Sequence, residues 1–244
     1  MLSLISTPIG NLDDISLRAI DVIKSADFIY TEDTRSFKKI LDSIECKKKC
    51  KSFHEHNEDI ICKEIIKHLK NKKHVVLTCE AGTPAISDPG YKLIRECLNL
   101  NLKYTLIPGP SSLINAVVLS GLPTDKFSFY GFIPKKNNAQ QKLFQKVSND
   151  EKTAIMFESV KRLRKTIISI SKHLDNNRHI SVCREMTKIH EQIVQGNCEH
   201  LLKKIDDGSL PLKGEIVLVI QGNITNNINI CLLYTSDAAD ELRS

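Results

Sequence analysis

Residues Thr78–Tyr91 read TCEAGTPAISDPGY and determine how the chain around them is interpreted. Gly82, Pro84, Pro89 and Gly90 are too dense for a continuous helix or strand. The apolar run before the stretch, residues 74–77, is typical of a buried strand, and residues 91–98 after it are typical of a helix. We therefore predict a shaped loop at the carboxyl end of a strand, where α/β sheets bind ligands. A plain connection is the alternative, although loops this long tend to be functional.

The pattern of strand, loop and helix recurs on both sides of this stretch. Three predicted strands end in loops rich in glycine and proline, at residues 8–11, 81–90 and 108–112. Such repeats favour a parallel sheet with right-handed crossovers over residues 1–120, with the three loops on one rim. Residues 121–125 are a predicted linker, and residues 121–230 form a second α/β domain.

Several local features have two interpretations. Asp13 or Asp14 is expected to cap the helix that follows. The basic segment Cys46–Lys51 is expected to be a solvated loop or a contact for phosphate backbone. A predicted helix over residues 160–173 carries four cations that form either a basic face toward RNA or a solvated face: Lys161, Arg162, Arg164 and Lys165.

Composition limits the class of protein. The 244 residues include 35 Lys and Arg against 29 Asp and Glu, a net charge of +6 that permits a nucleic-acid partner without requiring one. The eight cysteines form no Cys-x-x-Cys pair and are expected to be free thiols in a reducing cytoplasm. We expect no signal peptide and no membrane span. His54, His56 and Glu58 have the composition of metal ligands but lack further spaced ligands, so no metal is expected.

The last residues, 231–244, differ from the rest of the chain. The run CLLYTSDAADE lacks Lys and Asn, which are frequent before it, and resembles the translation of a transposon-type sequencing adapter. We predict that the native sequence stops near Ile230 and that residues 231–244 are a non-native tail. Resequencing of the locus tests this, because a native gene that continues through those codons would contradict it.

Several motifs occur together and in order: STPIGNLDDISLRA, TEDTR, HEHNE, EAGTPAISDPGY, PGPSS, GLPTDKFSFYGFIPKK, REMTK and LKGEIVLVI. The set spans residues 2–222 and resembles the ribosomal RNA small-subunit methyltransferase I family. That family belongs to the tetrapyrrole-methylase-like, class III group of S-adenosylmethionine methyltransferases. The resemblance implies two α/β domains, an N-terminal one with a mostly parallel sheet and a C-terminal one with a mixed sheet, and the cofactor folded between them.

The resemblance also implies a reaction and partners. The expected reaction is methyl transfer from S-adenosylmethionine to the ribose 2′-hydroxyl of a cytidine in the decoding region of 16S rRNA. The expected partner is the small ribosomal subunit, in the cytoplasm, and the expected assembly is a homodimer. The alternatives are a tetrapyrrole-type small-molecule methyltransferase of the same fold and an inactive RNA-binding relative. The segments TEDTR and HEHNE favour the RNA enzyme, whereas the Gly-Asp-Pro loop expected of a small-molecule enzyme is absent.

By this resemblance, functional roles fall on specific residues. The cofactor is expected against Pro8, Glu80, Ala81, Gly82, Pro84, Ser111, Ser112, Phe157, Arg184 and Gly214. The substrate is expected against Asn11, Arg35, His54, Asn57 and Lys188. A 2′-hydroxyl needs a base to accept its proton, and the candidates are Glu32, Asp33 and Asp88. For each of these residues the alternative is a helix cap or a surface salt bridge. Cys79-Glu80 departs from the family's Ser-Asp, and the extra methylene of Glu80 is expected to weaken cofactor binding or shift the loop.

Overall fold

The computed structural model describes residues 1–223, so the predicted tail at 231–244 lies outside the described residues. The described chain divides into two compact units. Unit 1 contains Met1–Leu119 and Cys183–Ile193, and unit 2 contains residues 120–182 and 194–223. Unit 1 therefore includes a segment from late in the sequence, in addition to the residues 1–120 that the sequence assigns to the first domain.

Unit 1 is built on a five-stranded sheet of order β3-β2-β4-β1-β5. All four pairings are parallel, as the repeated strand–loop–helix pattern predicts. The strands are β1 (Leu2–Ile5), β2 (Phe28–Thr31), β3 (Cys50–Ser52), β4 (Val75–Thr78) and β5 (Tyr104–Ile107). The central strands β1 and β4 are apolar and fully buried, as expected when helices cover both faces of a sheet.

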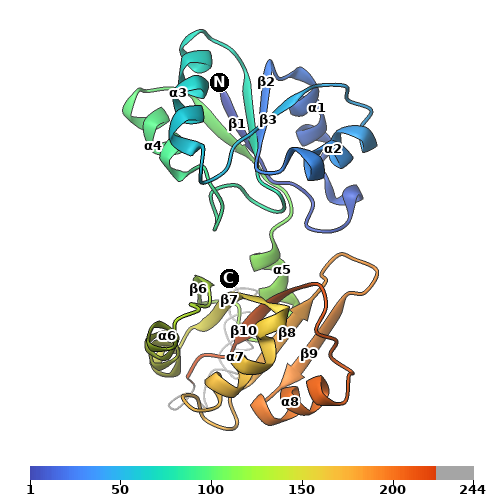
Figure 1. Ribbon diagram of the computed structural model, residues 1–244, viewed down its shortest axis with the longest axis vertical. Coiled ribbons are helices and arrows are strands. Elements are labelled where there is room, and N and C mark those ends of the chain that lie inside the picture. Colours follow the sequence, from blue (N-terminus) through green and yellow to red (C-terminus); the bar gives the residue numbers. More distant parts are fainter. Residues whose placement is uncertain (224–244) are drawn as a thin grey trace, which may run out of the picture. The chain divides into compact units, whose positions relative to one another are not determined.

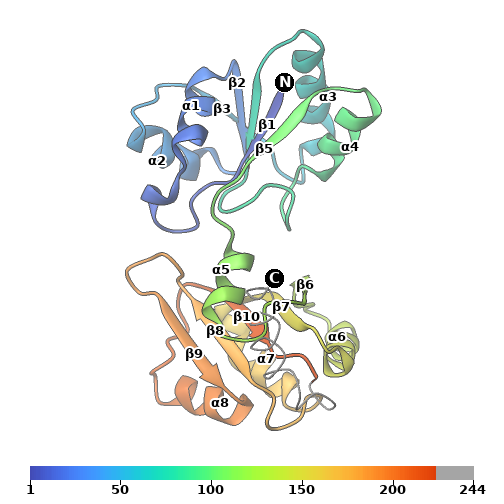
Figure 2. The same cartoon turned by 180° about the vertical axis from the view of Figure 1, so that it is seen from behind.

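Helices cover the two faces of this sheet in pairs (Figures 1 and 2). The helical elements of unit 1 are η1 (Leu12–Asp14), α1 (Leu17–Ser25), α2 (Thr34–Ser43), α3 (Glu58–Lys70), α4 (Tyr91–Asn99) and α5 (Ser112–Leu119). Ile23 and Phe37 of α1 and α2 join one hydrophobic cluster. Ile65 and Leu93 of α3 and α4 join the cluster on the other face. The loops that leave the carboxyl ends of β1 and β4 therefore lead to helices on opposite faces.

Unit 2 has a mixed five-stranded sheet of order β6-β7-β10-β8-β9. β6 pairs parallel with β7, and β7 pairs antiparallel with β10, which agrees with the mixed sheet expected from the resemblance. Its elements are β6 (Phe127–Phe132), α6 (Asn137–Asn149), β7 (Thr153–Ser159), η2 (Val160–Arg162), α7 (Leu163–Ile170), β8 (Ile180–Arg184), β9 (Gln192–Gly196), α8 (Cys198–Asp206) and β10 (Glu215–Ile220). The core includes the fully buried side chains of Phe144, Ile167 and Leu218.

The expected cap of the first helix is wrong. The side chain of Ser16, not that of Asp13 or Asp14, accepts a hydrogen bond from the Ala19 N–H at the start of α1. The two aspartates lie in the 3₁₀ turn η1, which ends in extended backbone at Ile15. The chain therefore starts a new helix after that turn, and the residue in the capping position is the serine.

The segment Cys46–Lys51 is only partly a loop, because Cys50–Ser52 forms the edge strand β3. Of the four cations on residues 160–173, Lys161 and Lys165 are exposed, while the two arginines have partners. The Arg162 guanidinium donates to the carbonyl oxygens of Ile133 and Pro134 and lies 3.2 Å from the buried carboxylate of Glu158. Arg164 forms two hydrogen bonds with Asp206. Both arginines are therefore engaged within unit 2.

Candidate active site at the carboxyl edge of the parallel sheet

The loops that follow β1 and β4 are joined by backbone hydrogen bonds. The Thr7 N–H donates to the Gly82 carbonyl over 2.9 Å, and the Gly82 N–H donates to the Thr7 carbonyl over 3.0 Å. Gly82 has a φ of +81°, which favours glycine. Because the chain leaves these neighbouring strands toward opposite faces, their carboxyl ends form the switch point at which α/β sheets bind ligands.

The loop after β5 also lies against the loop after β1. A Cβ atom on Gly109 would lie 3.0 Å from the Ser6 carbonyl oxygen, so only glycine fits without a shift. The Ser6 and Thr83 hydroxyls are 3.0 Å apart and tie the loop after β1 to Thr78–Tyr91. The Ser111 carbonyl accepts the Asn115 N–H at the start of α5, whose first residue is Ser112. Three Gly/Pro loops thus meet at one rim, as the sequence predicts.

Two threonine hydroxyls at the ends of β2 and β4 are buried at this edge. Thr31 and Thr78 end neighbouring strands in register, and their side chains are 0% and 2% exposed. Within residues 1–223 neither hydroxyl has a hydrogen-bond partner. A buried unpaired polar group costs about 1–3 kcal/mol, so both positions are suited to contact with a polar ligand.

Carboxylates gather beside these loops. Burial raises the pKa of Asp88 to about 6, and the negative charge of Glu32 adds to this effect. Burial also raises the pKa of Glu32, while a hydrogen bond from the Glu80 N–H, 3.4 Å away, opposes the rise. Glu32 and Asp88 therefore lie close enough to influence each other, and both hold a proton more tightly than a free carboxylate does.

The departure at Cys79-Glu80 has a local structural explanation. The Cys79 thiol is buried, donates to the carbonyl oxygens of Ala81 and Gly82, and has a raised pKa because of that burial. Glu80 points the other way, and its carboxylate accepts from the Ser36 hydroxyl in the first turn of α2 over 3.4 Å. A carboxylate is favourable at a helix N-terminus, so the longer side chain of Glu80 has a partner there.

Asp33 and Arg35 lie at the start of α2. The Asp33 carboxylate accepts the Arg35 N–H over 2.7 Å, and this bond lowers the pKa of Asp33. Asp33 is therefore the N-cap of α2, which is the alternative stated for it from the sequence. The Arg35 side chain is 92% exposed.

Asn11 and Lys188 are brought together by the late segment of unit 1. The Asn11 N–H donates to the Thr187 hydroxyl over 3.1 Å, and a Cβ on Gly10 would lie 2.5 Å from Cγ of Lys188. The Lys188 ammonium is 2.9 Å from the Glu185 carboxylate, and Arg184 donates to the His190 carbonyl. An open groove of about 600 Å³ lies between the two loops and is lined by Gly10, Asn11, Leu12, Thr187, Lys188, Ile189 and His190.

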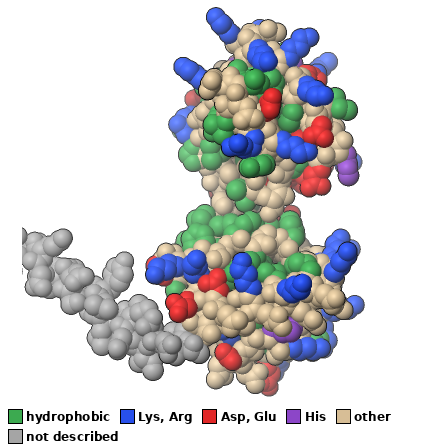
Figure 3. Space-filling model, turned by 90° about the vertical axis from the view of Figure 1, so that its left-hand side faces the viewer, with side chains coloured by type: hydrophobic (Ala, Val, Ile, Leu, Met, Phe, Trp, Pro, Cys, Tyr) green, Lys and Arg blue, Asp and Glu red, His purple; other side chains and the backbone are tan. Residues whose placement is uncertain are grey.

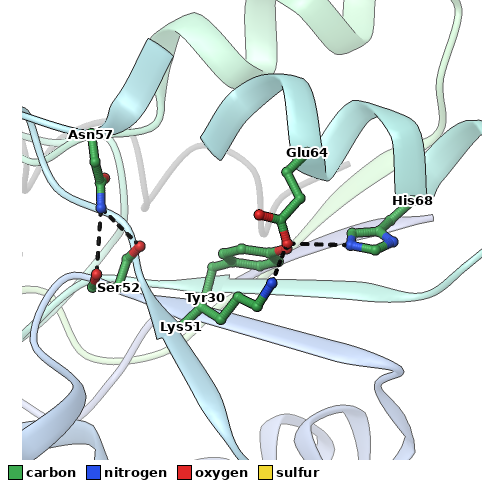
Figure 4. A network of polar contacts seen from close by, with 6 residues as sticks. All are labelled: Tyr30, Lys51, Ser52, Asn57, Glu64 and His68. Carbon is green, nitrogen blue, oxygen red and sulfur yellow. Dashed lines mark hydrogen bonds and ion pairs between the residues drawn. The ribbon is translucent and has the colours of Figure 1, made fainter. Parts of the chain in front are cut away.

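His54 and Asn57 belong to the turn between β3 and α3. The Asn57 side chain accepts the His54 N–H over 2.9 Å and donates to the Ser52 carbonyl over 3.1 Å (Figure 4). The buried carboxylate of Glu58, the next residue, accepts the Gly90 N–H over 3.0 Å at the end of the Thr78–Tyr91 loop. Glu58 therefore holds that loop rather than facing His54 as a metal ligand.

Phe157 and Gly214 lie in unit 2. The Phe157 ring packs edge-on against Phe129 and Phe132, with centroid distances of 4.9 and 5.3 Å. Gly214 is exposed and has a φ of +90° just before β10. In unit 1, Pro8 and Pro84 are buried in their loops, whereas Ala81 is exposed.

Sequence reasoning missed three features of this edge. From the sequence, Glu58 is interpreted only as a possible metal ligand, although the first residue of a helix can also anchor a neighbouring loop. Thr31 and Thr78 follow Ile29 and Val76 by two residues, so strand alternation would have placed both hydroxyls on one face of the sheet. Contact of Cys79 with two loop carbonyls has no sequence signal, because it depends on how the loop folds back.

Comparisons with known proteins agree with this architecture. The family model of tetrapyrrole (corrin/porphyrin) methylases matches residues 1–202. A crystal structure of uroporphyrin-III-C-methyltransferase from Thermus thermophilus has a TM-score of 0.62 at 12% identity, covering 90% of this chain and 93% of that one, which shows a shared fold. Among residues 1–223, no helix has the length and apolar character needed to cross a membrane.

Other known proteins are much more similar to this chain in sequence than that crystal structure is. The ribosomal RNA small subunit methyltransferase I of Rickettsia prowazekii is 42% identical over 223 residues, covering 91% of this chain and 79% of the relative. The protein of the same name from Thermotoga maritima is 38% identical over 221 residues, covering 91% of this chain and 98% of the relative. The chain therefore belongs to the tetrapyrrole (corrin/porphyrin) methylases and, within them, to the ribosomal RNA small subunit methyltransferase I family.

Proposed function

We propose that this protein transfers a methyl group from S-adenosylmethionine to the ribose 2′-hydroxyl of a cytidine in the decoding region of 16S rRNA. The observation that carries the proposal is 38–42% identity over 91% of the chain to relatives called ribosomal RNA small subunit methyltransferase I. The geometry of the carboxyl edge is compatible with it, since glycine loops, unpaired hydroxyls and proton-accepting carboxylates lie at the same rim.

The residues at this rim fit an adenosyl-amino-acid cofactor. The unpartnered hydroxyls of Thr31 and Thr78 would pair with its polar groups, and Gly82 lets backbone approach it closely. The other residues proposed to hold the cofactor are Pro8, Glu80, Ala81, Pro84, Ser111, Ser112, Phe157, Arg184 and Gly214. When bound, the cofactor supplies an electrophilic methyl group on a sulfonium.

We assign the proton acceptor to Asp88, assisted by Glu32. A carboxylate oxygen of Asp88 would accept the hydroxyl proton as the ribose oxygen takes the methyl group that bound S-adenosylmethionine would supply, with the neutral thioether as the leaving group. Its raised pKa makes Asp88 a stronger base than an ordinary aspartate, and it is largely ionised above about pH 6. Asp33 is less suited, because its carboxylate caps α2 and its pKa is lowered.

The proposed substrate contacts lie around the same edge. Arg35 is exposed at the start of α2 and would pair with a phosphate. Asn11 and Lys188 line the groove beside the late segment, and His54 lies close enough to Glu32 to affect its pKa. Asn57 holds the backbone of His54, so we assign it a positioning role.

We also propose that the protein acts in the cytoplasm as a homodimer. The edge strand β5 exposes Tyr104 and Leu106, and the end of the neighbouring helix α4 exposes Leu98. A second copy would cover this apolar surface. Light scattering tests the dimer. A Leu106→Asp variant is expected to be monomeric, and a wild-type protein that is monomeric at micromolar concentration would contradict the proposal.

Mass mapping of small-subunit RNA from a deletion strain tests the reaction. One cytidine 2′-O-methyl group should disappear and return with the wild-type gene but not with Asp88→Asn. An unchanged methylation pattern would overturn the proposal. Methylation of a porphyrin precursor in preference to purified small subunits would favour the small-molecule alternative. Failure to bind S-adenosylmethionine in calorimetry would favour the inactive RNA-binding alternative.

A further inference from the structure

A basic groove follows α2 from its first residue, Thr34, to the segment before β3. Its volume is about 370 Å³, and its lining comes from α2 and the segment before β3: Thr34, Lys38, Leu41, Asp42, Cys46, Lys47, Lys48, Lys49 and Cys50. Four of these nine residues are lysines and one is acidic. A second groove of about 340 Å³ shares Lys48 and Lys49 and also contains Lys51. The two grooves are therefore neighbours, with the same lysines between them.

The lysines of these grooves fall into two groups. The Lys48 ammonium donates to the Ala26 carbonyl at the end of α1, and Lys51 pairs with Glu64. Figure 4 shows that the Glu64 carboxylate also receives the Tyr30 hydroxyl and lies beside His68. These two contacts bind the segment to α1 and α3 and so hold its backbone in place.

The other group is Lys38, Lys47 and Lys49. All three are exposed, and within residues 1–223 none of their ammonium groups has a hydrogen bond or an ion pair. Some exposed cations elsewhere in unit 1, such as Lys73 and Lys92, pair with carboxylates. Others do not, and the groove differs from them in holding three such lysines along one lining. Like charges held on a fixed surface repel one another, and a bound polyanion removes that repulsion.

The direction of the groove connects it to the candidate site. Thr34, at one end of the lining, is the first residue of α2 and follows Glu32 and Asp33 directly. The lining on α2 runs from Thr34 to Asp42, so at about 1.5 Å per residue it extends about 12 Å from the carboxyl edge. A polyanion bound there would run from the edge of the sheet along α2 to Lys47 and Lys49.

We propose that the groove between α2 and Cys46–Cys50 binds the phosphate backbone of the substrate RNA outside the nucleotide that reacts. The inference rests on the proposed function for the identity of the polyanion. Lysines on an edge strand also protect a sheet from pairing with other chains, and this is the competing explanation. The two explanations differ because only phosphate binding makes the lysines contribute to the salt dependence of RNA affinity.

The test compares two triple variants of the full chain. Lys38→Gln/Lys47→Gln/Lys49→Gln removes the three unpaired charges. The matched control Lys63→Gln/Lys67→Gln/Lys70→Gln removes three exposed charges from α3. The face of unit 1 that carries α3 and α4 is turned to the viewer in Figure 3, where Lys and Arg side chains are dispersed among acidic ones. Both variants have the same net charge, so a difference in their RNA affinity depends on where the removed lysines lie.

Affinity for purified small subunits is measured over a range of salt concentrations. The groove variant is expected to lower the slope of log affinity against log salt by about 2, since each phosphate contact contributes roughly 0.7 for a single strand. The KM for the RNA should rise about tenfold or more with little change in kcat, as expected for uniform binding. Lys→Arg replacements at the same three positions should keep the wild-type slope.

An unchanged slope in the groove variant, or an equal loss in the α3 control, would overturn the inference. If the groove variant no longer binds S-adenosylmethionine, or no longer unfolds cooperatively, the inference would also be overturned, because the lysines would then be needed for folding. Failure of the proposed function is distinguishable, since wild-type protein would then leave small subunits unmethylated whatever its salt slope.

Discussion

Replacement of Asp88 by asparagine should make the protein more stable and inactive. Burial, together with the charge of Glu32, raises the pKa of Asp88 from 3.8 to about 6 in the folded state. At about 1.36 kcal/mol per pH unit this rise corresponds to about 3 kcal/mol. Because Asp88 is only half-buried, solvent screening reduces the figure to roughly half, about 1.5 kcal/mol.

The sign of this effect follows from proton linkage. The folded state holds the Asp88 proton more tightly than the unfolded chain, so the resulting stability is fully present below about pH 4. It is lost as the pH rises through about 6, where the folded carboxyl ionises. Asparagine cannot ionise, so Asp88→Asn should exceed the wild type by about 1.5 kcal/mol near pH 8 and match it near pH 4.

Urea denaturation at both pH values, with fluorescence and circular dichroism as probes, measures this difference. Asp33→Asn is the matched control, because asparagine also caps helices and the pKa of Asp33 is lowered rather than raised. That variant should gain no stability at high pH. A stability difference for Asp88→Asn that is equal at both pH values, or that has the opposite sign, would refute the electrostatic reasoning. Retained methyl transfer by Asp88→Asn would refute its assignment as the base.

Three further substitutions test the framework of the site. Gly82→Val should abolish S-adenosylmethionine binding in calorimetry. A Cβ atom at this position would lie 3.5 Å from the Ile9 side chain, so it causes no clash. A β-branched residue at a φ of +81° nevertheless costs at least about 1–2 kcal/mol and shifts the backbone. Glu58→Ala should lower the free energy of unfolding by about 1–3 kcal/mol, because it leaves the Gly90 N–H unpaired. Faster proteolysis within Thr78–Tyr91 would show that the loss arises in this loop. Arg162→Ala should cost about 3 kcal/mol because the Glu158 carboxylate stays buried without its cation, while an unchanged melting temperature would contradict this.

Much of the fold could be predicted from local patterns. Apolar runs such as residues 75–77 predict buried strands, and the spacing of residues such as Phe37, Ile40 and Leu41 predicts a helix with one buried face. The mixed sheet of unit 2 came only from the resemblance to a known family, because the direction of a strand leaves no mark in its own residues. The short strand Cys50–Ser52 has no sequence signal of its own, because three residues, of which the middle one is exposed, carry too little periodicity.

The candidate site shows the same division. Glycine and proline in Thr78–Tyr91 specify a loop by themselves, because their effect on φ and on hydrogen bonding is intrinsic to the residue. The partners of that loop depend on residues distant in sequence: Thr7 joins Gly82, and Glu58 accepts the Gly90 N–H. No local pattern encodes such pairs, because they form only when separate strands reach the same edge of the sheet.

The sequence by itself therefore determined the loops, the parallel sheet of the first unit and, through its ordered motifs, the family. Tertiary structure alone decided the chemistry of individual groups. It made Asp33 a helix cap and gave Asp88 a pKa of about 6, which suits the role of base that we propose for it, although both are aspartates. The physical reason is that a pKa is set by burial and neighbouring charges, and both are properties of the folded chain.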